Sequence, residues 1–434
     1  MEEQKEHKAK SWLQRLKDES WEAELLVSAI AIFGTFKLFD FVNWTTNFFI
    51  DNLIPDQYTI AYFITFFSLI AVSVLVSMFV IHFILRAYWV GLVGLNSVFP
   101  DYSIDDSVYS KIYTEKMLSI LPKLKDSIQK VDEMCSVIFS VAFTFLFLYG
   151  YMALMTSIYL LLFNLLSEYV PKYVLLIPAI LIGIGAMFQI MVSLYANLKK
   201  NKEKEKLQLL NFTLVRYVNM VMFGPLNKNI LQVFMIFGSN FKKKKSLSYL
   251  MLLFLFSGTL VAGVQLKNTN IFYLVSSNYQ KYFDSYKTYS NYYKDTNETD
   301  FLLAPEIQSD LIQTNVLEVF IPIFNYESSM RETVCGIYEE QTGKNRLELR
   351  TDRAEYLKAC YKKYHNIFLD GKKVEASFLR YNNHNKTNQF GILSFINLDG
   401  VSKGLHEVKI EKVNSKGVLL KWTIPFYYNS KEKE

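Results

Sequence analysis

Residues 58–85 read YTIAYFITFFSLIAVSVLVSMFVIHFIL, a stretch without a single Asp, Glu, Lys or Arg. As a helix it would be about 42 Å long, whereas the hydrocarbon core of a bilayer is roughly 30 Å thick. Four more long apolar segments follow this pattern: Leu25–Ile50, Cys135–Leu166, Tyr173–Leu198 and Leu247–Leu266. The sequence therefore predicts an α-helical multi-pass membrane domain with about five transmembrane helices.

Composition supports a membrane protein and excludes an ordinary soluble chain. Hydrophobic residues make up 51% of the 434 residues and aromatic residues 16%, and they are grouped into long blocks. The formal net charge of +6 lies mostly in the stretches between the blocks, so it gives no reason to expect nucleic acid as a partner. The abundance of Lys, Asn, Ile, Tyr and Phe is typical of an AT-rich bacterial genome.

Positive charges lie on one side of the apolar segments. The tail before Glu24 holds 5 Lys and Arg residues, the stretch 86–133 holds 6 and the stretch 199–246 holds 11. The opposing connections, 51–57 and 167–172, contain only Lys172. The positive-inside rule therefore predicts a protein of the bacterial inner membrane, with a cytoplasmic N-terminus and a periplasmic or extracellular C-terminal part.

Four parts are expected along the chain. Residues 1–24 form a cytoplasmic basic amphipathic tail, and residues 25–267 form the membrane domain, with cytoplasmic amphipathic loops at 86–133 and 199–246. Residues 268–299 form a Tyr-rich helical linker, and residues 300–434 form an exported β-rich domain. The small-xxx-small pairs Ala179/Gly183 and Gly258/Ala262 predict close helix packing in the fourth and fifth apolar segments.

Two apolar pieces of the cytoplasmic loops allow two interpretations. A straight helix from Tyr58 to Pro100 would be about 60 Å long, so we expect a turn near Arg86–Trp89, with Val90–Phe99 lying in the headgroup plane. The alternative for the segment around Gly91 and Gly94 is a re-entrant loop. Residues 207–237 likewise form either a helical hairpin on the membrane surface or a pair of helices that dips into the membrane and returns.

The C-terminal third is typical of a small antiparallel β-sandwich of Ig-like type. One helix is expected over Asp352–Tyr364, and Asp370-Gly371 is a strong hairpin signal. The expected strands alternate β-branched and aromatic residues with polar ones: Val316–Phe324, Asn366–Leu369, Val374–Tyr381, Gly391–Leu398, His406–Val413 and Val418–Tyr427.

The first apolar segment carries an intramembrane polar stripe. Its residues recur at helical spacing: Lys37, Asp40, Asn43 and Asn47. Ionisable residues at mid-bilayer are costly and usually functional, which favours an ion or proton path. The competing hypothesis is that Lys37 and Asp40, three residues apart, neutralise each other and hold helices together. His82 and Arg86 are expected at the cytoplasmic interface.

Two features of the exported part could stabilise it or bind partners. Cys335 and Cys360 are candidates for a disulfide, because that compartment is oxidising, although free thiols are equally compatible with the sequence. An interaction face is predicted where tyrosines repeat at three- and four-residue spacing: Tyr279, Tyr282, Tyr286, Tyr289 and Tyr293. Such a face packs on the β-rich domain, a sister subunit or the membrane interface, or alternatively stacks on a sugar.

No motif for catalysis, nucleotide binding or metal binding is recognisable. There is no Walker A loop, dinucleotide glycine fingerprint, nucleophile elbow or Cys-x-x-Cys pair. We therefore expect no cofactor, no metal and no enzymatic activity. The predicted function is that of a membrane-anchored binding, scaffold or sensor component, whose partners are the lipid bilayer and an envelope protein or further copies of itself. The alternative is a channel or transporter built on the Lys37/Asp40 stripe.

Overall fold

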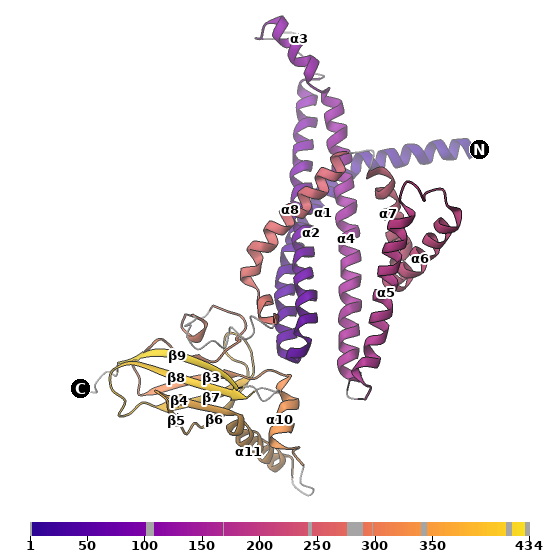
Figure 1. The fold of residues 1–434 in the computed structure, drawn as a ribbon. Helices are drawn as coiled ribbons and strands as arrows, with labels where there is room; N and C mark the ends of the chain where they lie inside the picture. Colours follow the sequence, from indigo (N-terminus) through magenta and orange to yellow (C-terminus); the bar gives the residue numbers. More distant parts are fainter. Residues whose placement is uncertain are drawn as a thin grey trace. The chain divides into compact units, whose positions relative to one another are not determined.

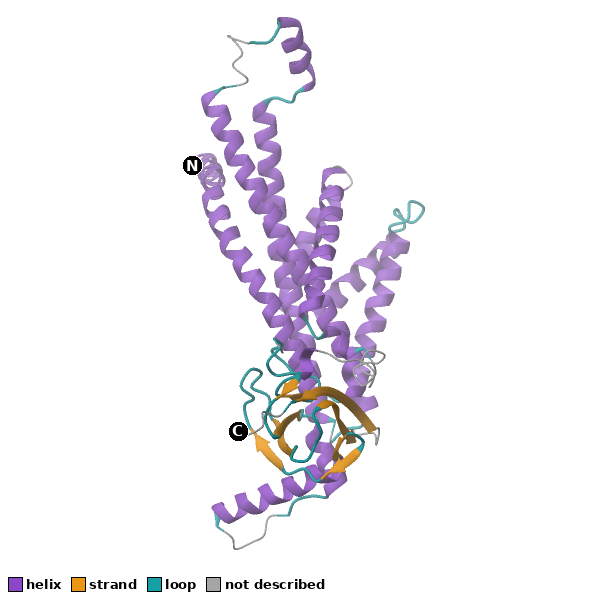
Figure 2. Cartoon of the chain, turned by 90° about the vertical axis from the view of Figure 1, so that its left-hand side faces the viewer, coloured by secondary structure: helices purple, strands orange, loops and turns teal. Residues whose placement is uncertain are grey.

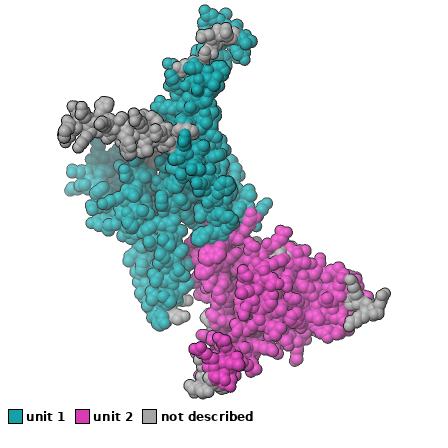
Figure 3. Space-filling model, turned by 180° about the vertical axis from the view of Figure 1, so that it is seen from behind, with its two compact units in different colours: residues 1–41, 67–267 teal, residues 42–66, 268–434 magenta. Residues whose placement is uncertain are grey.

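The structure of the protein is a computed structural model (Figure 1), which describes residues 2–100, 108–167, 169–241, 245–275, 290–296, 298–339, 345–413 and 419–429. Long helices come first in the chain and two β-sheets come last. The chain divides into two compact units, coloured separately in Figure 3. Unit 1 comprises residues 1–41 and 67–267, and unit 2 comprises residues 42–66 and 268–434.

Helices account for nearly all of the described residues up to Asn268. Among the described residues, six helical stretches are long and apolar enough to cross a membrane, rather than the expected five. The helices are α1 (Glu2–Asn52), α2 (Tyr58–Val98), α3 (Lys111–Ile120), α4 (Leu124–Leu166), α5 (Lys172–Ala196), α6 (Glu205–Phe223), α7 (Asn227–Phe241) and α8 (Lys245–Gln265). Short 3₁₀ turns lie at Pro55–Gln57, Gly224–Leu226, Leu266–Asn268, Ile271–Leu274 and Ser290–Tyr292.

The core of unit 1 lies between α2, α4 and α8. Val74 and Phe79 of α2 pack with Ile138 of α4 and Phe254 of α8, and all four side chains are buried. Gly258 brings α8 close to α2, because a Cβ atom there would lie 2.5 Å from Cγ2 and 2.8 Å from Cα of Val74. The close helix contact expected at Gly258 is therefore present. At Gly183 nothing lies within 4 Å of the Cβ position among the described residues, so the close contact expected there is not formed.

Helix α2 contradicts the expected turn near Arg86. It continues without a break to Val98 and ends before Pro100. Gly91 and Gly94 both remain helical, so residues 90–98 form neither a separate segment after a turn nor a re-entrant loop. The turn was predicted from an interfacial Arg86, whereas the structure buries this side chain inside the bundle. Pro122 lies in the short break between α3 and α4, where a proline interrupts helical hydrogen bonding.

Helix α6 folds back along α5 as an antiparallel hairpin. The Ser193 hydroxyl donates to Asn211 Oδ1 at 2.7 Å, and Gln208 Nε2 donates to the Ala196 carbonyl at 2.9 Å. Gly224, at the turn after α6, packs against Tyr151 of α4. The pair α6 and α7 therefore packs against the apolar helices α4 and α5.

Two sheets form the β-rich part of unit 2 (Figure 2). The four-stranded sheet has the order β1-β3-β7-β6 and is antiparallel, and the five-stranded sheet has the order β2-β9-β8-β4-β5. The strands are β1 (Glu306–Ile307), β2 (Leu311–Ile312), β3 (Val316–Pro322), β4 (His365–Leu369), β5 (Lys372–Val374), β6 (Phe378–Tyr381), β7 (Gly391–Asn397), β8 (Gly404–Val413) and β9 (Leu419–Tyr428). Because β2 pairs with β9 in parallel, the five-stranded sheet is mixed rather than purely antiparallel.

The expected strands are present with one correction. Residues 374–381 form two strands, since β5 belongs to the five-stranded sheet and β6 to the other. The Asp370-Gly371 hairpin joins β4 to β5, and both residues have positive φ, 48° and 77°. Helix α11 (Arg346–Tyr364) begins six residues before the expected Asp352, because Asn345 provides a capping box with Glu348. Strands β1 and β2 and helix α10 (Glu327–Cys335) were not predicted.

The inner faces of both sheets close around one apolar core. Val319 of β3 and Ile396 of β7 oppose Ile410 of β8 and Ile424 of β9, and each is at most 1% exposed. Residues of α11 such as Tyr361 extend this core.

Candidate functional site

A buried charge cluster joins three helices of unit 1. Arg86 of α2, whose side chain is 1% exposed, forms ion pairs with Glu24 of α1 and with Asp132 of α4, the latter at 2.6 Å. One turn away on α2, His82 Nδ1 lies 2.7 Å from Ser28 Oγ of α1. A guanidinium has five donors in a rigid fork and suits two carboxylates at once. The cluster therefore fixes the register of α1, α2 and α4.

From the sequence, His82 and Arg86 were expected at the cytoplasmic interface, and their burial between helices was not predicted. His82 is fully buried and Arg86 nearly so. A signal was available in the sequence: Glu24 and Asp132 flank apolar segments on the side where Arg86 also lies. Charges of opposite sign at one depth can pair. Glu24 and Asp132 lie 62 and 46 residues from Arg86 in the chain, so no local sequence pattern predicts these pairs.

The predicted polar stripe of α1 does not gather at one site. Lys37 Nζ lies 3.0 Å from Asp40 Oδ2, but the two side chains are 84% and 71% exposed. Asn43 is half-buried, and its buried Oδ1 has no hydrogen-bond partner among the described residues. Asn47 Oδ1 accepts a hydrogen bond from Asn270 at 2.9 Å. The charged pair is therefore formed within one helix and faces away from the rest of unit 1.

In unit 2, the end of α1 is tied to the loop that follows β3. Asp51 Oδ1 accepts a hydrogen bond from the backbone N–H of Asn325 at 3.0 Å, and the Asp51 carbonyl accepts one from Tyr326 at 3.0 Å. The Asn325 amide also donates to Asp51 Oδ2 at 2.5 Å. Two backbone bonds and a side-chain bond at adjacent residues make this a geometrically defined attachment, which sequence reasoning missed.

Helix α10 begins beside this attachment and is held at both ends. At its first residue, the buried Glu327 binds Lys412 of β8, with Oε1 2.6 Å from Nζ. At its last residue, Cys335 forms a disulfide with Cys360 of α11. The pair nominated from the sequence is therefore bonded in the structure, and it connects the two helices that lie next to the β-sheets.

Two titratable side chains are buried near Lys412. Burial, together with the Lys412 charge, holds the pKa of His365 well below its ordinary value, and burial raises the pKa of Tyr364. His365 is the direct neighbour of Lys412 across the β4–β8 pair. The low pKa of His365 keeps the imidazole neutral at physiological pH. The charged groups of this interior are therefore Lys412 and its partner Glu327.

The predicted tyrosine face falls mostly outside the described residues. Tyr279, Tyr282, Tyr286 and Tyr289 lie there, and only Tyr293 can be placed. Tyr293 is 8% exposed in the β-domain core, and its hydroxyl donates to the Pro425 carbonyl at 2.7 Å. Its role in the structure is thus to attach the chain before β1 to β9.

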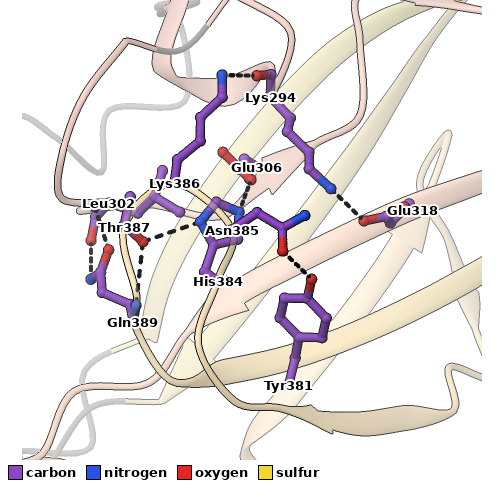
Figure 4. A network of polar contacts seen from close by, with 10 residues as sticks. All are labelled: Lys294, Leu302, Glu306, Glu318, Tyr381, His384, Asn385, Lys386, Thr387 and Gln389. Carbon is purple, nitrogen blue, oxygen red and sulfur yellow. Dashed lines mark hydrogen bonds and ion pairs between the residues drawn. The ribbon is translucent and has the colours of Figure 1, made fainter.

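A network around the loop between β6 and β7 covers the four-stranded sheet (Figure 4). His384 Nε2 lies 2.7 Å from Glu306 Oε1 of β1, and both residues are 1% exposed. Gln389 exchanges two hydrogen bonds with the backbone of Leu302. In Figure 4 the side chains of His384, Lys386 and Gln389 reach toward β1 and the chain before it, so these contacts hold the loop in place.

The outer face of the five-stranded sheet carries three adjoining exposed apolar side chains. Tyr427 of β9 lies between Leu311 of β2 and Leu405 of β8, because both are its direct cross-strand partners. The three side chains are 50%, 44% and 75% exposed, and we call them the apolar row. Elsewhere on the same face β8 and β9 carry charges, including a Lys409–Glu411 ion pair at 2.7 Å. The row thus presents apolar surface that the core does not use.

No match to a family model, a curated protein or a solved structure was found for this chain. Among the described residues, no group of three or more His, Cys, Asp or Glu side chains is arranged to hold a metal ion.

Proposed function

We propose that the protein is a membrane-anchored binding protein, a scaffold or sensor component of a bacterial envelope. Its C-terminal two-sheet domain would bind an envelope protein outside the inner membrane, and its helices would anchor that domain. The observation that carries this proposal is the apolar row of Leu311, Tyr427 and Leu405. Exposed apolar residues that adjoin one another on a sheet with a complete core are typical of protein-binding surfaces.

The charge distribution supports the orientation. Lys and Arg cluster at the N-terminus and in the stretches 86–133 and 199–246, which favours the cytoplasm for all three. Lysine runs flank α6 and α7 at both ends, at 199–206 and 242–245, so this pair would enter and leave the membrane on the same side. Helices α1, α2, α4, α5 and α8 then cross fully, and residues after Leu266 are exported.

The attachment at Asp51 supports a role in signalling as well as anchoring. It bonds the end of α1 to the loop that leads into α10, and α10 is held by Glu327 and the disulfide. A displacement of α10 on partner binding would therefore act directly on α1. The competing function, a channel or transporter that uses Lys37 and Asp40, has weaker support because this pair is exposed on the outer face of α1.

Site-specific photocrosslinking in intact cells tests the proposal. A benzophenone amino acid at Leu405 is expected to give a covalent adduct with one envelope protein, and Tyr427→Ser in the same chain is expected to reduce the adduct at least fivefold. The matched control is Leu379 of β6, which is 49% exposed on the other sheet. No adduct at Leu405, or equal adducts at both positions, would contradict the proposal.

A further inference from the structure

The face of α1 that carries Lys37 has the residue spacing of a coiled-coil seam. Exposed side chains recur along α1 at alternating intervals of four and three residues: Leu26, Ile30, Phe33, Lys37 and Asp40. Their exposed fractions are 63%, 63%, 76%, 84% and 71%. We call these five residues the α1 seam. Alternating intervals of four and three place residues on one narrow stripe that matches a parallel neighbouring helix.

The α1 seam cannot be satisfied by lipid alone. Lys37 is the middle residue of the apolar stretch Glu22–Asn52, which places it near the centre of the bilayer. A Lys–Asp pair in contact with hydrocarbon has lost its hydration on the exposed side, and a single contact within the helix leaves most of its hydrogen-bonding groups unsatisfied. Polar groups at this depth normally face another protein segment.

We propose that the α1 seam is a self-association surface, on which α1 of a second copy of this chain packs in parallel. Copies in one membrane share the same orientation, so a two-fold axis along the membrane normal brings equivalent residues to equal depth. Equivalent residues then lie opposite each other, and Lys37 of each copy also lies within one helical turn of Asp40 of the other, which is three residues along the helix. The seam is thus complementary in charge to itself, and a polar residue at such a position specifies register and partner number.

This inference rests on the membrane placement of α1 in the proposed function and is independent of the binding partner of the β-domain. If the apolar row failed its crosslinking test, the seam would be unaffected. If α1 proved not to cross the membrane, both proposals would lose their basis, whereas a monomeric protein with the expected topology would overturn only the seam.

Charge reversal tests the pairing in the full-length chain. Lys37→Asp gives two negative charges on each seam, and Asp40→Lys gives two positive charges. Each variant alone, co-expressed with a differently tagged copy of itself, is expected to co-purify at least tenfold less than the wild type does. Co-expression of the two variants together is expected to restore co-purification, since each seam now meets its opposite. Unchanged co-purification of the single variants, or no rescue in the mixture, would overturn the proposal.

A second measurement leaves the charges intact and so does not depend on the folding of charge variants. Phe33→Cys in the wild-type background is expected to form disulfide-linked dimers when membranes are oxidised. The control is Leu181→Cys on α5, which is 64% exposed in another apolar helix. The native Cys135 is buried. Dimer yields at position 33 no higher than at position 181, or a wild type that is monomeric by native mass spectrometry in nanodiscs, would also overturn the seam.

Discussion

Arg86 occupies a position at which a single side chain connects three helices. Its guanidinium is almost fully buried and binds carboxylates from α1 and α4. Taking such a charge out of water is costly, and the cost is offset only while both partners remain. The cluster therefore contributes less to net stability than to the specific alignment of the helices.

Replacement of Arg86 by leucine is expected to destabilise unit 1 by about 3–5 kcal/mol, because the carboxylates of Glu24 and Asp132 would lose their guanidinium partner among apolar helices. The triple replacement of Arg86, Glu24 and Asp132 by leucine is expected to recover most of this loss, since no charge is stranded. Thermal unfolding of the purified protein in detergent measures both. A triple variant as unstable as the single one would show that the charges themselves hold the bundle.

His406 and Asp370 make part of the β-domain stability dependent on pH. Burial opposes both shifts, but the hydrogen bonds from the Glu407 N–H and from His406 hold the pKa of Asp370 below its ordinary value. The hydrogen bonds to Asp370 and to the Ser402 carbonyl raise the pKa of His406. The pair therefore stabilises the fold between these two pKa values. Its contribution is lost as pH falls through that of Asp370 and as pH rises through that of His406.

We expect His406→Gln to lower the free energy of unfolding by less than about 1 kcal/mol at pH 5.5, because Asp370 is 44% exposed and solvent screens the pair. At pH 9 the same substitution is expected to cost less, since His406 has then lost its proton in the wild type. The difference between the two chains in thermal unfolding at the two pH values measures this. Buried His365 acts oppositely and destabilises both chains alike as pH falls below about 6.5.

At the scale of elements, the turn between α6 and α7 depends on a glycine. Gly224 has φ 48° and ψ −124°, a conformation that L-residues rarely adopt, and a Cβ there would lie 2.5 Å from the Tyr151 hydroxyl oxygen. The turn lets α6 end beside α4 while α7 continues in another direction. Its position within the apolar helices is the reason for interpreting this pair as dipping into the membrane.

Gly224→Ala is expected to destabilise this hairpin by about 1–3 kcal/mol, because the backbone would be strained. Gly185→Ala in α5 is the matched control, since nothing lies within 4 Å of its Cβ position and alanine favours a helix by up to about 1 kcal/mol. Hydrogen exchange of residues 205–236 in the intact protein distinguishes the two variants. Faster exchange in both, or in neither, would contradict the structural role of Gly224.

At the scale of the whole molecule, the proposed orientation in the membrane rests on the distribution of Lys and Arg. Alkaline phosphatase fused after Glu434 is expected to be active and green fluorescent protein at the same site dark, because the C-terminus would be exported. Fusions after Lys204 are the internal control and are expected to give the opposite result. Fluorescence with silent phosphatase at the C-terminus would refute the proposed topology.

The sequence by itself determined most of the apolar helices and the longer strands. Apolar stretches longer than the bilayer is thick, the alternation in β8 and β9 and the Asp370-Gly371 turn are local signals, and each corresponds to an observed element. The Cys335–Cys360 pair could be nominated because only these two cysteines occur in the C-terminal part. These features depend on residues that are close together in the chain.

Only the tertiary structure decided where these elements meet. Residues 374–381 alternate like one strand, yet the chain crosses between sheets within them. Lys37 and Arg86 both lie in apolar segments, but Arg86 is buried by partners 46 and 62 residues away while Lys37 stays exposed. Whether a charged side chain is buried depends on helices that are far away in the sequence. Local periodicity predicts the helix face on which a side chain lies, but it does not predict which helix packs against that face.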